Sequence, residues 1–154
     1  MKQSEIPEIV QIQKSAFKRL YDIYHDKDNP YLKGFFEIMD WLETPGLTYR
    51  KIVADNTICG AIAYYNNAAG EYYLARIFVS PSYQRKGIGT EAVRKCELLF
   101  ADAHKFTTDV PEDQQIIKAF FIKNGFTDTG ERDTVNDSLV TGIYEKIVSS
   151  VSIT

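Results

Sequence analysis

Three strand-like segments follow one another between residues 47 and 80, and this succession constrains the fold of the chain most strongly. The segments LTYRKIVAD (47–55), TICGAIAYYNN (57–67) and EYYLARIFVS (71–80) are rich in β-branched and aromatic residues. The loops between them, at 55–56 and 66–70, are too short for a crossover and favour hairpins. We therefore expect an antiparallel meander of three strands.

Helical patterns surround this meander. Residues 4–23 and 32–43 have the capping residues and apolar spacing of two helices. Apolar positions from Ile88 to Phe100 share one face of a third helix. We expect a short strand at 105–110 and then a helix at 115–124 that Gly125 ends. The segment 126–148 holds one or two more strands. The order ααβββαβαββ predicts a single α/β (α+β) domain over 1–154, with a mixed, mostly antiparallel sheet flanked by helices.

Composition excludes several classes of protein. A net charge of −3 gives no general attraction for nucleic acid, and no apolar run is long enough to span a membrane. The N-terminal residues do not resemble a secretory signal. The two cysteines, Cys59 and Cys96, are far apart and lie at apolar positions, so we expect core residues rather than a zinc site. We expect a cytoplasmic protein without a metal, and without nucleic-acid or membrane partners.

A glycine-rich loop, SPSYQRKGIGTEA (80–92), joins the third strand to the next helix. Gly87 and Gly89 allow the backbone to approach a ligand closely, and Arg85 and Lys86 supply positive charge. The N–H groups at the start of a helix bind anions, and the helix dipole favours negative charge there. The loop therefore predicts a site for a phosphate-bearing cofactor.

The segment QRKGIG (84–89) resembles the acetyl-CoA-binding motif of the GNAT superfamily of N-acetyltransferases, Gln/Arg-x-x-Gly-x-Gly/Ala. The segment QQIIKAFFIKNGF (114–126) resembles the second signature of that superfamily, a helix that ends in Gly-Phe. With the order of elements, the resemblance covers roughly residues 4–148. It implies a GNAT-like fold that binds acetyl-CoA and acetylates a primary amine of a small molecule or a peptide.

The resemblance also implies how acetyl-CoA binds. Strands 71–80 and 105–110 should separate, with the pantetheine arm between them, and the Val79 N–H should stabilise the oxyanion when the amine attacks directly in a ternary complex. The cofactor-binding residues implied are Ile77, Phe78, Val79, Gln84, Arg85, Lys86, Gly87, Ile88, Gly89, Thr90, Gln114 and Phe121.

The sequence departs from the family pattern at three catalytic or binding positions. Phe121 stands where many members have a tyrosine that protonates the leaving thiolate, and Gln114 stands where an asparagine often contacts pantetheine. Tyr73 stands where histone-acetylating members have a glutamate base, and Glu71 lies two residues earlier on the same strand face. Glu71 and Tyr73 are therefore the two candidates for the base. Arg76, between apolar neighbours, could form a structural ion pair or meet an acceptor carboxylate.

Two alternative functions remain at this point. Gly87, Gly89 and Ala92 fit the GxGxxA pattern of dinucleotide binding, and Asp109 lies about 20 residues on, as that pattern requires. Against this, the segment 81–86 separates the first glycine from the strand. The second alternative is a non-catalytic acyl-CoA-binding or sensor module, because Phe121 cannot donate a proton and no base is assigned.

The start of the chain bears on the edge of the sheet. GNAT proteins generally begin with a β-strand before the first helix, and three residues before Ser4 are too few for a full one. We therefore expect this first strand to be missing or very short. An uncovered sheet edge invites pairing with another chain, so we also expect a homodimer.

Overall fold

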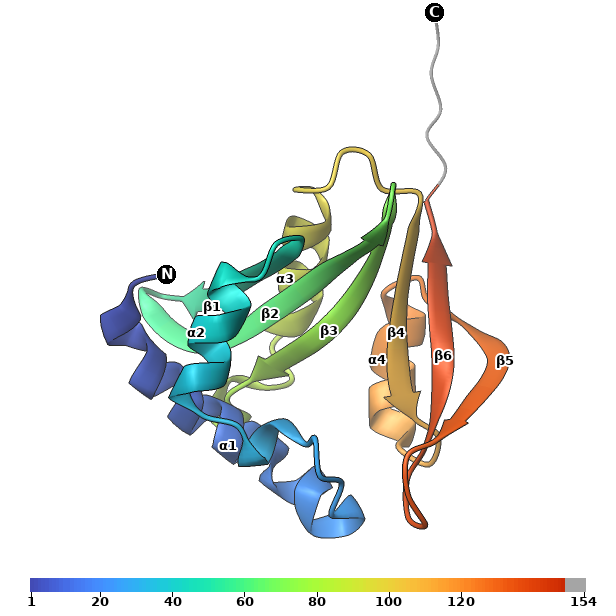
Figure 1. Ribbon diagram of the computed structural model, residues 1–154, viewed down its shortest axis with the longest axis horizontal. Coiled ribbons are helices and arrows are strands. Elements are labelled where there is room, and N and C mark those ends of the chain that lie inside the picture. The colour runs from blue at the N-terminus through green and yellow to red at the C-terminus, as the bar shows by residue number, and fades with distance from the viewer. Residues whose placement is uncertain (149–154) are drawn as a thin grey trace, which may run out of the picture.

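The sheet of the protein has six strands in the order β1-β2-β3-β4-β6-β5, in a computed structural model that describes residues 1–148 (Figure 1). Every neighbouring pair is antiparallel except β3 and β4, which are parallel. This confirms the predicted mixed, mostly antiparallel sheet. The strands are β1 (Leu47–Ala54), β2 (Thr57–Ala68), β3 (Glu71–Val79), β4 (Lys105–Pro111), β5 (Thr127–Thr134) and β6 (Val140–Ile147).

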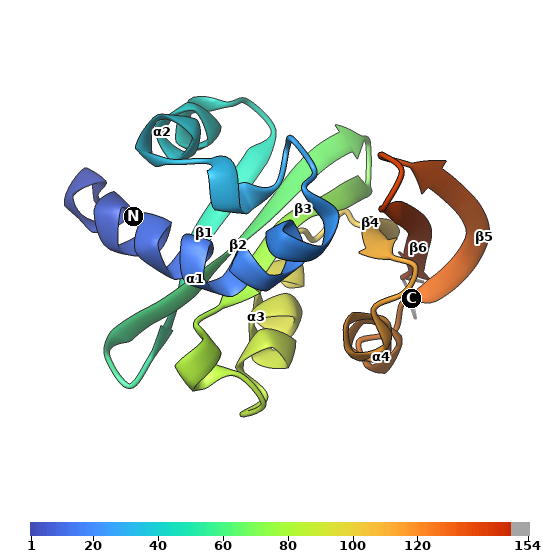
Figure 2. The ribbon, with the colours of Figure 1, turned by 90° about the horizontal axis from the view of Figure 1, so that it is seen from below.

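Four α-helices cover the sheet unevenly. The front face, toward the viewer in Figure 1, carries α1 (Ile6–Tyr24) and α2 (Phe35–Glu43), and the back face carries α3 (Ile88–Glu97) and α4 (Gln115–Lys123). Figure 2 shows that α1 and α2 lie over β1, β2 and β3 only, so in the described part of the chain no helix covers the front of β4, β6 and β5. Short 3-10 turns occupy Gln3–Glu5, Pro30–Leu32 and Pro81–Tyr83. Within residues 1–148 no strand precedes α1, as expected.

Two apolar clusters form the core, one on each face of the sheet. The front cluster joins α1 and α2 to the sheet, and the back cluster joins α3 and α4 to it. Cys59 and Cys96 both lie in the back cluster, and burial raises the pKa of the Cys96 thiol to about 11. The prediction that both cysteines are core residues is confirmed.

The two parallel strands pair over only part of their length. Residues 71–73 of β3 pair with residues 105–107 of β4, and beyond them the strands diverge (Figure 1). In the register with β2, Leu74 and Arg76 have successive partners, so Ala75 is an extra residue that makes a β-bulge at this point. The Thr108 hydroxyl donates to the Leu74 carbonyl at 3.1 Å where the ladder ends. We call the unpaired edges 74–79 and 108–111 the β3–β4 gap.

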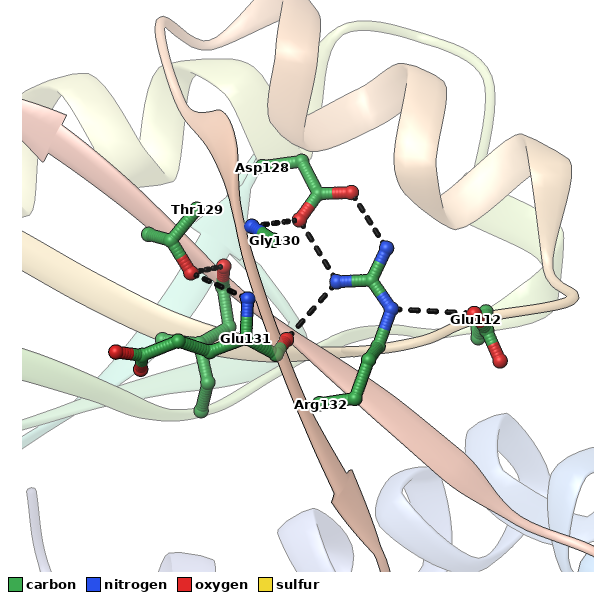
Figure 3. A network of polar contacts seen from close by, with 7 residues as sticks. Glu112, Asp128, Thr129, Gly130, Glu131 and Arg132 are labelled. Carbon is green, nitrogen blue, oxygen red and sulfur yellow. Dashed lines mark hydrogen bonds and ion pairs between the residues drawn. The ribbon is translucent and has the colours of Figure 1, made fainter.

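The outer strand β5 is held by polar contacts instead of burial. Its ladder with β6 is interrupted between Asp128 and Arg132, and all eight residues of the strand are exposed. Arg132 forms a bidentate pair with Asp128, through bonds of 2.7 and 2.8 Å, and also donates to Glu112 at 3.1 Å (Figure 3). The Gly130 N–H donates to the same Asp128 carboxylate. These bonds fix the bulged part of β5 and tie it to Glu112, which follows β4.

The described residues carry neither a membrane helix nor a metal-binding group. No helix within residues 1–148 is long and apolar enough to cross a membrane. The same part of the chain contains no group of three or more His, Cys, Asp or Glu side chains that could hold a metal ion.

Candidate active site

The start of α3 presents backbone donors near the open end of the β3–β4 gap, where β3 ends. Gly87 precedes the helix with φ = 77°, a left-handed conformation that favours glycine. The first helical bond runs from the Glu91 N–H to the Gly87 carbonyl at 3.1 Å. The N–H groups of residues 88–90 precede this first helical bond in the chain, and no described side chain caps the helix. Three backbone donors are therefore available to an anion.

The loop before the helix supplies the positive charge. Arg85, with φ = 65°, and Lys86 are exposed, and the Lys86 ammonium lies 5.5 Å from the centre of the Tyr83 ring. A side chain at Gly87 would meet no atom within 4 Å, so space above the loop is open. Gly89 has a structural role besides the predicted contact with the cofactor, which stays a prediction, because a Cβ there would lie 3.0 Å from the Phe120 ring. Its lack of a side chain lets α3 approach α4.

The edge of β3 offers main-chain groups to the β3–β4 gap at alternate residues. The Ser80 N–H donates to the Cys59 carbonyl of β2 at 2.6 Å. Alternation along an antiparallel strand then directs the main chain of Phe78 toward β2 and that of Ile77 and Val79 toward the gap. The geometry therefore speaks against the predicted main-chain contact of Phe78 with the cofactor, and its side chain is buried in the front cluster. Ile77 and Val79 keep their N–H groups directed into the gap.

Gln84 secures the end of this edge. Its side-chain amide donates to the Val79 carbonyl at 2.9 Å. This bond uses the carbonyl of Val79, the last residue of the strand, and leaves the Val79 N–H free for a ligand. In the structure Gln84 contacts the strand that lines the gap, and its predicted contact with the cofactor stays a prediction.

A hollow of about 430 Å³ opens on the bare front face beside the β3–β4 gap. The hollow contains three carboxylates and a single ammonium group, that of Lys105, which lies 3.7 Å from Glu145. This balance of charge favours a cationic ligand. We call it the front hollow, and it is lined by Tyr73, Lys105, Thr107, Thr108, Asp109, Thr129, Glu131, Ile143 and Glu145.

The sequence matches the family model of the acetyltransferase (GNAT) family over residues 7–126, which is more than half of the chain. The chain belongs to this family. The resemblance found in the loop and in the second signature is thereby confirmed, and the dinucleotide alternative is set aside. A search of curated protein sequences finds no match.

Three crystal structures show the GNAT fold at low sequence identity. The PaiA N-acetyltransferase of Thermoplasma acidophilum in complex with coenzyme A is 18% identical, with a TM-score of 0.73 over 96% of each chain. The ribosomal-protein-alanine N-acetyltransferase of Brucella melitensis is 16% identical, with a TM-score of 0.75 over 96% of this chain and 97% of that one. A GNAT family acetyltransferase of Elizabethkingia anophelis with acetyl-CoA bound is 16% identical, with a TM-score of 0.60 over 73% and 82%. At these identities the likeness shows the fold.

In this GNAT acetyltransferase, Glu71 and Tyr73 have different surroundings. Glu71 lies at the closed end of the parallel strands, 3.9 Å from the Lys105 ammonium. It is six residues before Ile77, about 20 Å along the strand, which is too far to act on a group held there. Tyr73 lines the front hollow and donates its hydroxyl to Asp109 at 2.7 Å. Burial, and then this bond, raise the pKa of the Tyr73 phenol, so Tyr73 keeps its proton at neutral pH and is not a base.

Gln114 belongs to a set of bonds that sequence reasoning missed. Its amide donates to the Tyr24 hydroxyl at 3.1 Å and accepts from Arg19 at 2.9 Å. The Tyr24 hydroxyl also donates to Asp113, and the Asn136 side chain donates to the Tyr24 carbonyl at 3.0 Å. We call these five residues the α1 clasp. It joins the end of α1 to the loops that follow β4 and β5, across the open end of the gap (Figure 2).

Phe121 lies in the back cluster, 5% exposed and edge-on to Phe126 at 5.5 Å between ring centres. An apolar ring at this position supplies no proton to a leaving thiolate. Its predicted contact with the cofactor stays a prediction, as do those of Thr90 and Ile88 at the start of α3.

Arg76 forms a structural ion pair, one of the two roles considered for it. Its guanidinium donates to Glu37 at 2.6 Å and to Gln13 at 3.2 Å, and lies 4.1 Å from the centre of the Trp41 ring. The side chain is only 6% exposed. Arg76 therefore ties α1 and α2 to β3 and does not face the front hollow.

Proposed function

We propose that this protein transfers the acetyl group of acetyl-CoA to a primary amine of a small molecule or a peptide. The observation that carries the proposal is the position of β3 between the two candidate binding regions. Tyr73 at its paired end lines the front hollow, and the edge from 74 to 79 is unpaired with β4. The loop that follows β3 then leads to the free backbone donors at the start of α3. Crystal structures of relatives with coenzyme A or acetyl-CoA bound support the choice of cosubstrate.

Each part of acetyl-CoA has a counterpart along this path. The pyrophosphate suits Arg85, Lys86 and the N–H groups of residues 88–90, which provide charge and backbone donors together. The pantetheine arm suits the free edge of β3. The N–H groups of Ile77 and Val79 both face the gap and are available to the thioester oxygen, where developing negative charge needs donors.

The front hollow supports an amine acceptor. Its carboxylates outnumber its one lysine, which favours the ammonium form of an amine when it binds. The unprotonated amine then attacks the thioester carbon directly, and the gap contributes by holding the two reactants in position. Phe121 supplies no proton, so the thiolate takes one from solvent, which a thiol with an ordinary pKa of about 8.5 permits near neutral pH.

The cofactor half of the proposal is tested by calorimetric titration of acetyl-CoA. The double variant Arg85→Ala/Lys86→Ala should bind at least tenfold more weakly than the wild type, because each charged hydrogen bond contributes about 1.5–3 kcal/mol and about 1.4 kcal/mol is tenfold in affinity. Lys95→Ala, an exposed lysine at the other end of α3, is the matched control and should bind as the wild type does. Equal affinity of all three proteins would remove the loop from the site.

Turnover separates the enzyme from a non-catalytic acyl-CoA-binding module, which Phe121 favours. Thiol release from acetyl-CoA is followed with three amines: n-butylamine, Nα-acetyllysine and trialanine. An enzyme turns over at least one of them, whereas a binding module takes up acetyl-CoA and releases no thiol. A cytoplasmic location and a homodimer through the exposed edge of β1 remain predictions, the second to be tested by sedimentation.

A further inference from the structure

We infer that Asp109 is the general base of this acetyl transfer and that the Tyr73 hydroxyl holds its carboxylate in place. The inference rests on the proposed function and goes beyond it by naming the residue that activates the amine. Neither candidate from the sequence meets this need, because Glu71 lies at the closed end of the strands and Tyr73 retains its proton.

The register of the parallel strands places Asp109 beside the gap. Residues 71, 72 and 73 lie opposite 105, 106 and 107. The same step continued along both strands places Asp109 level with Ala75, the bulged residue of β3. Asp109 is therefore among the first residues of β4 beyond the ladder, where the gap begins.

The alternation of β4 turns Asp109 toward the front. Its neighbours Thr108 and Val110 are 4% and 0% exposed, and Phe106 and Val110 belong to the back cluster. Side chains at alternate positions point to opposite faces, so Thr107 and Asp109 line the front hollow. Asp109 itself is exposed, which allows solvent to carry away a proton that it has accepted.

The bond from Tyr73 leaves one oxygen of this carboxylate for the acceptor. Tyr73 donates to Oδ2 at 2.7 Å, so Oδ1 can accept from an ammonium group in the hollow. The titratable groups that share the hollow come from four strands. They are Tyr73 on β3, Lys105 on β4, Glu131 on β5 and Glu145 on β6. Of these, Tyr73 alone has a hydrogen bond to Asp109 in the described structure.

The proton balance of the reaction closes with these groups. Asp109 takes one proton from the acceptor ammonium, and the freed lone pair of nitrogen forms the C–N bond to the thioester carbon. When the tetrahedral intermediate collapses, the C–S bond breaks and the thiolate receives the second nitrogen-bound proton through water. Asp109 then returns its proton to solvent, so one proton is released for each amide formed.

The test compares Asp109→Asn with the wild type and with Glu131→Gln, which removes a carboxylate from the opposite wall of the same hollow. At neutral pH, kcat of Asp109→Asn should fall about 100-fold or more with the best of the three amines, as is typical for loss of a general base. The KM for acetyl-CoA should be unchanged. Glu131→Gln should raise the KM for the amine, because it removes one of the carboxylates that attract the ammonium form, while its kcat should stay within about threefold of the wild type. Raising the pH should recover part of the lost rate, because more amine is then unprotonated.

Tyr73→Phe tests the positioning role. It should lower kcat by about tenfold or less, with an unchanged KM for acetyl-CoA and with the alkaline limb of the pH profile retained. Circular dichroism and acetyl-CoA titration confirm that each variant is folded.

The outcomes separate the inference from the proposed function. A wild-type protein that binds acetyl-CoA and acetylates none of the three amines overturns the proposed function, and the inference with it. A wild type that turns over, beside an Asp109→Asn variant with the same kcat or a Glu131→Gln variant whose kcat falls equally, overturns the inference alone.

Discussion

The strands β2 and β5 show how differently the two halves of the sheet are built. Six consecutive residues of β2, from Cys59 to Tyr64, are buried, because helices cover both of its faces. No residue of β5 is buried, and the strand is held by its interrupted ladder with β6 and by the polar bonds of Asp128 and Arg132. One half of the sheet is covered on both faces, and the other is covered by α4 at the back and open at the front.

The difference teaches where this fold can accept a ligand. In the covered half, α1 and α2 occupy the front of the sheet and Arg76 is held in an ion pair beneath them. In the bare half, the side chains of β4, β5 and β6 face an open hollow. The β3–β4 gap lies between the two halves, so the proposed binding of the cosubstrate there places the acceptor on the bare side.

The largest expected effect on stability lies in the covered half, at Gly60. A Cβ at this position would lie 2.0 Å from the Phe78 carbonyl oxygen, which is a backbone atom of the neighbouring strand. Gly60→Ala must therefore force β2 and β3 apart, and we expect it to lower the free energy of unfolding by about 3 kcal/mol. Urea denaturation measures the change.

Gly34→Ala is the control for this substitution. Gly34 has no atom within 4 Å of its Cβ position and precedes α2 with a negative φ, so the loss there should be under about 1 kcal/mol. Equal stability of the two variants would show that β2 and β3 separate easily, and that the covered half is less rigid than its burial indicates.

Much of this architecture could be predicted from the sequence, and for physical reasons. The covered strand β2 carries a continuous run, CGAIAY (59–64), that is buried on both faces of the sheet. The sequence TDTGERDT of β5 has no such pattern, and its place in the sheet depends on bonds to β6 and to Glu112. The separation of β3 and β4 came from the family resemblance rather than from periodicity.

The sequence indicates the parts of the candidate site whose residues are adjacent in the chain, and it does not indicate the parts whose residues are far apart. The loop 84–89 carries its own chemistry in six consecutive residues. Asp109 becomes a candidate base only through the register of β4 against β3, which no local pattern encodes. Tyr24 and Asp113 meet across 89 positions of sequence, and Gly89 is explained by the Phe120 ring of another helix. Such pairings are properties of the tertiary structure.

The connection between the two halves is tested at the α1 clasp. Tyr24 is almost fully buried, and burial, followed by its bond to Asp113, raises the pKa of its hydroxyl. Tyr24→Phe removes bonds to Asp113 and Gln114, so the free energy of unfolding should fall by about 1 kcal/mol.

Tyr21→Phe is the matched control one turn earlier. The Tyr21 ring stacks on Tyr31 at 5.3 Å, a contact that phenylalanine retains, so this variant should be close to the wild type in denaturation. If the two variants were equally stable, the side-chain bonds of the clasp would not stabilise the contact between the two halves of the sheet. Hydrogen exchange of the loop around Asp113 would then be the same in both variants.

The smallest expected effect lies in the bare half, at Asp128. The Arg132 guanidinium, with help from the Gly130 N–H, lowers the pKa of this carboxyl from 3.8 to about 2 (Figure 3). Because the pKa is lower in the folded protein than in the unfolded chain, the ion pair stabilises the fold above about pH 4, and this contribution is lost as the pH falls through about 2. The wild type should therefore melt slightly above Asp128→Asn near neutral pH, and the difference should shrink on acidification. It should also shrink in about 1 M salt, since exposed pairs are screened. A difference that stayed constant from neutral pH down to about 2 would assign the effect to the Gly130 turn instead, and β5 would then be held by its backbone and not by its charges.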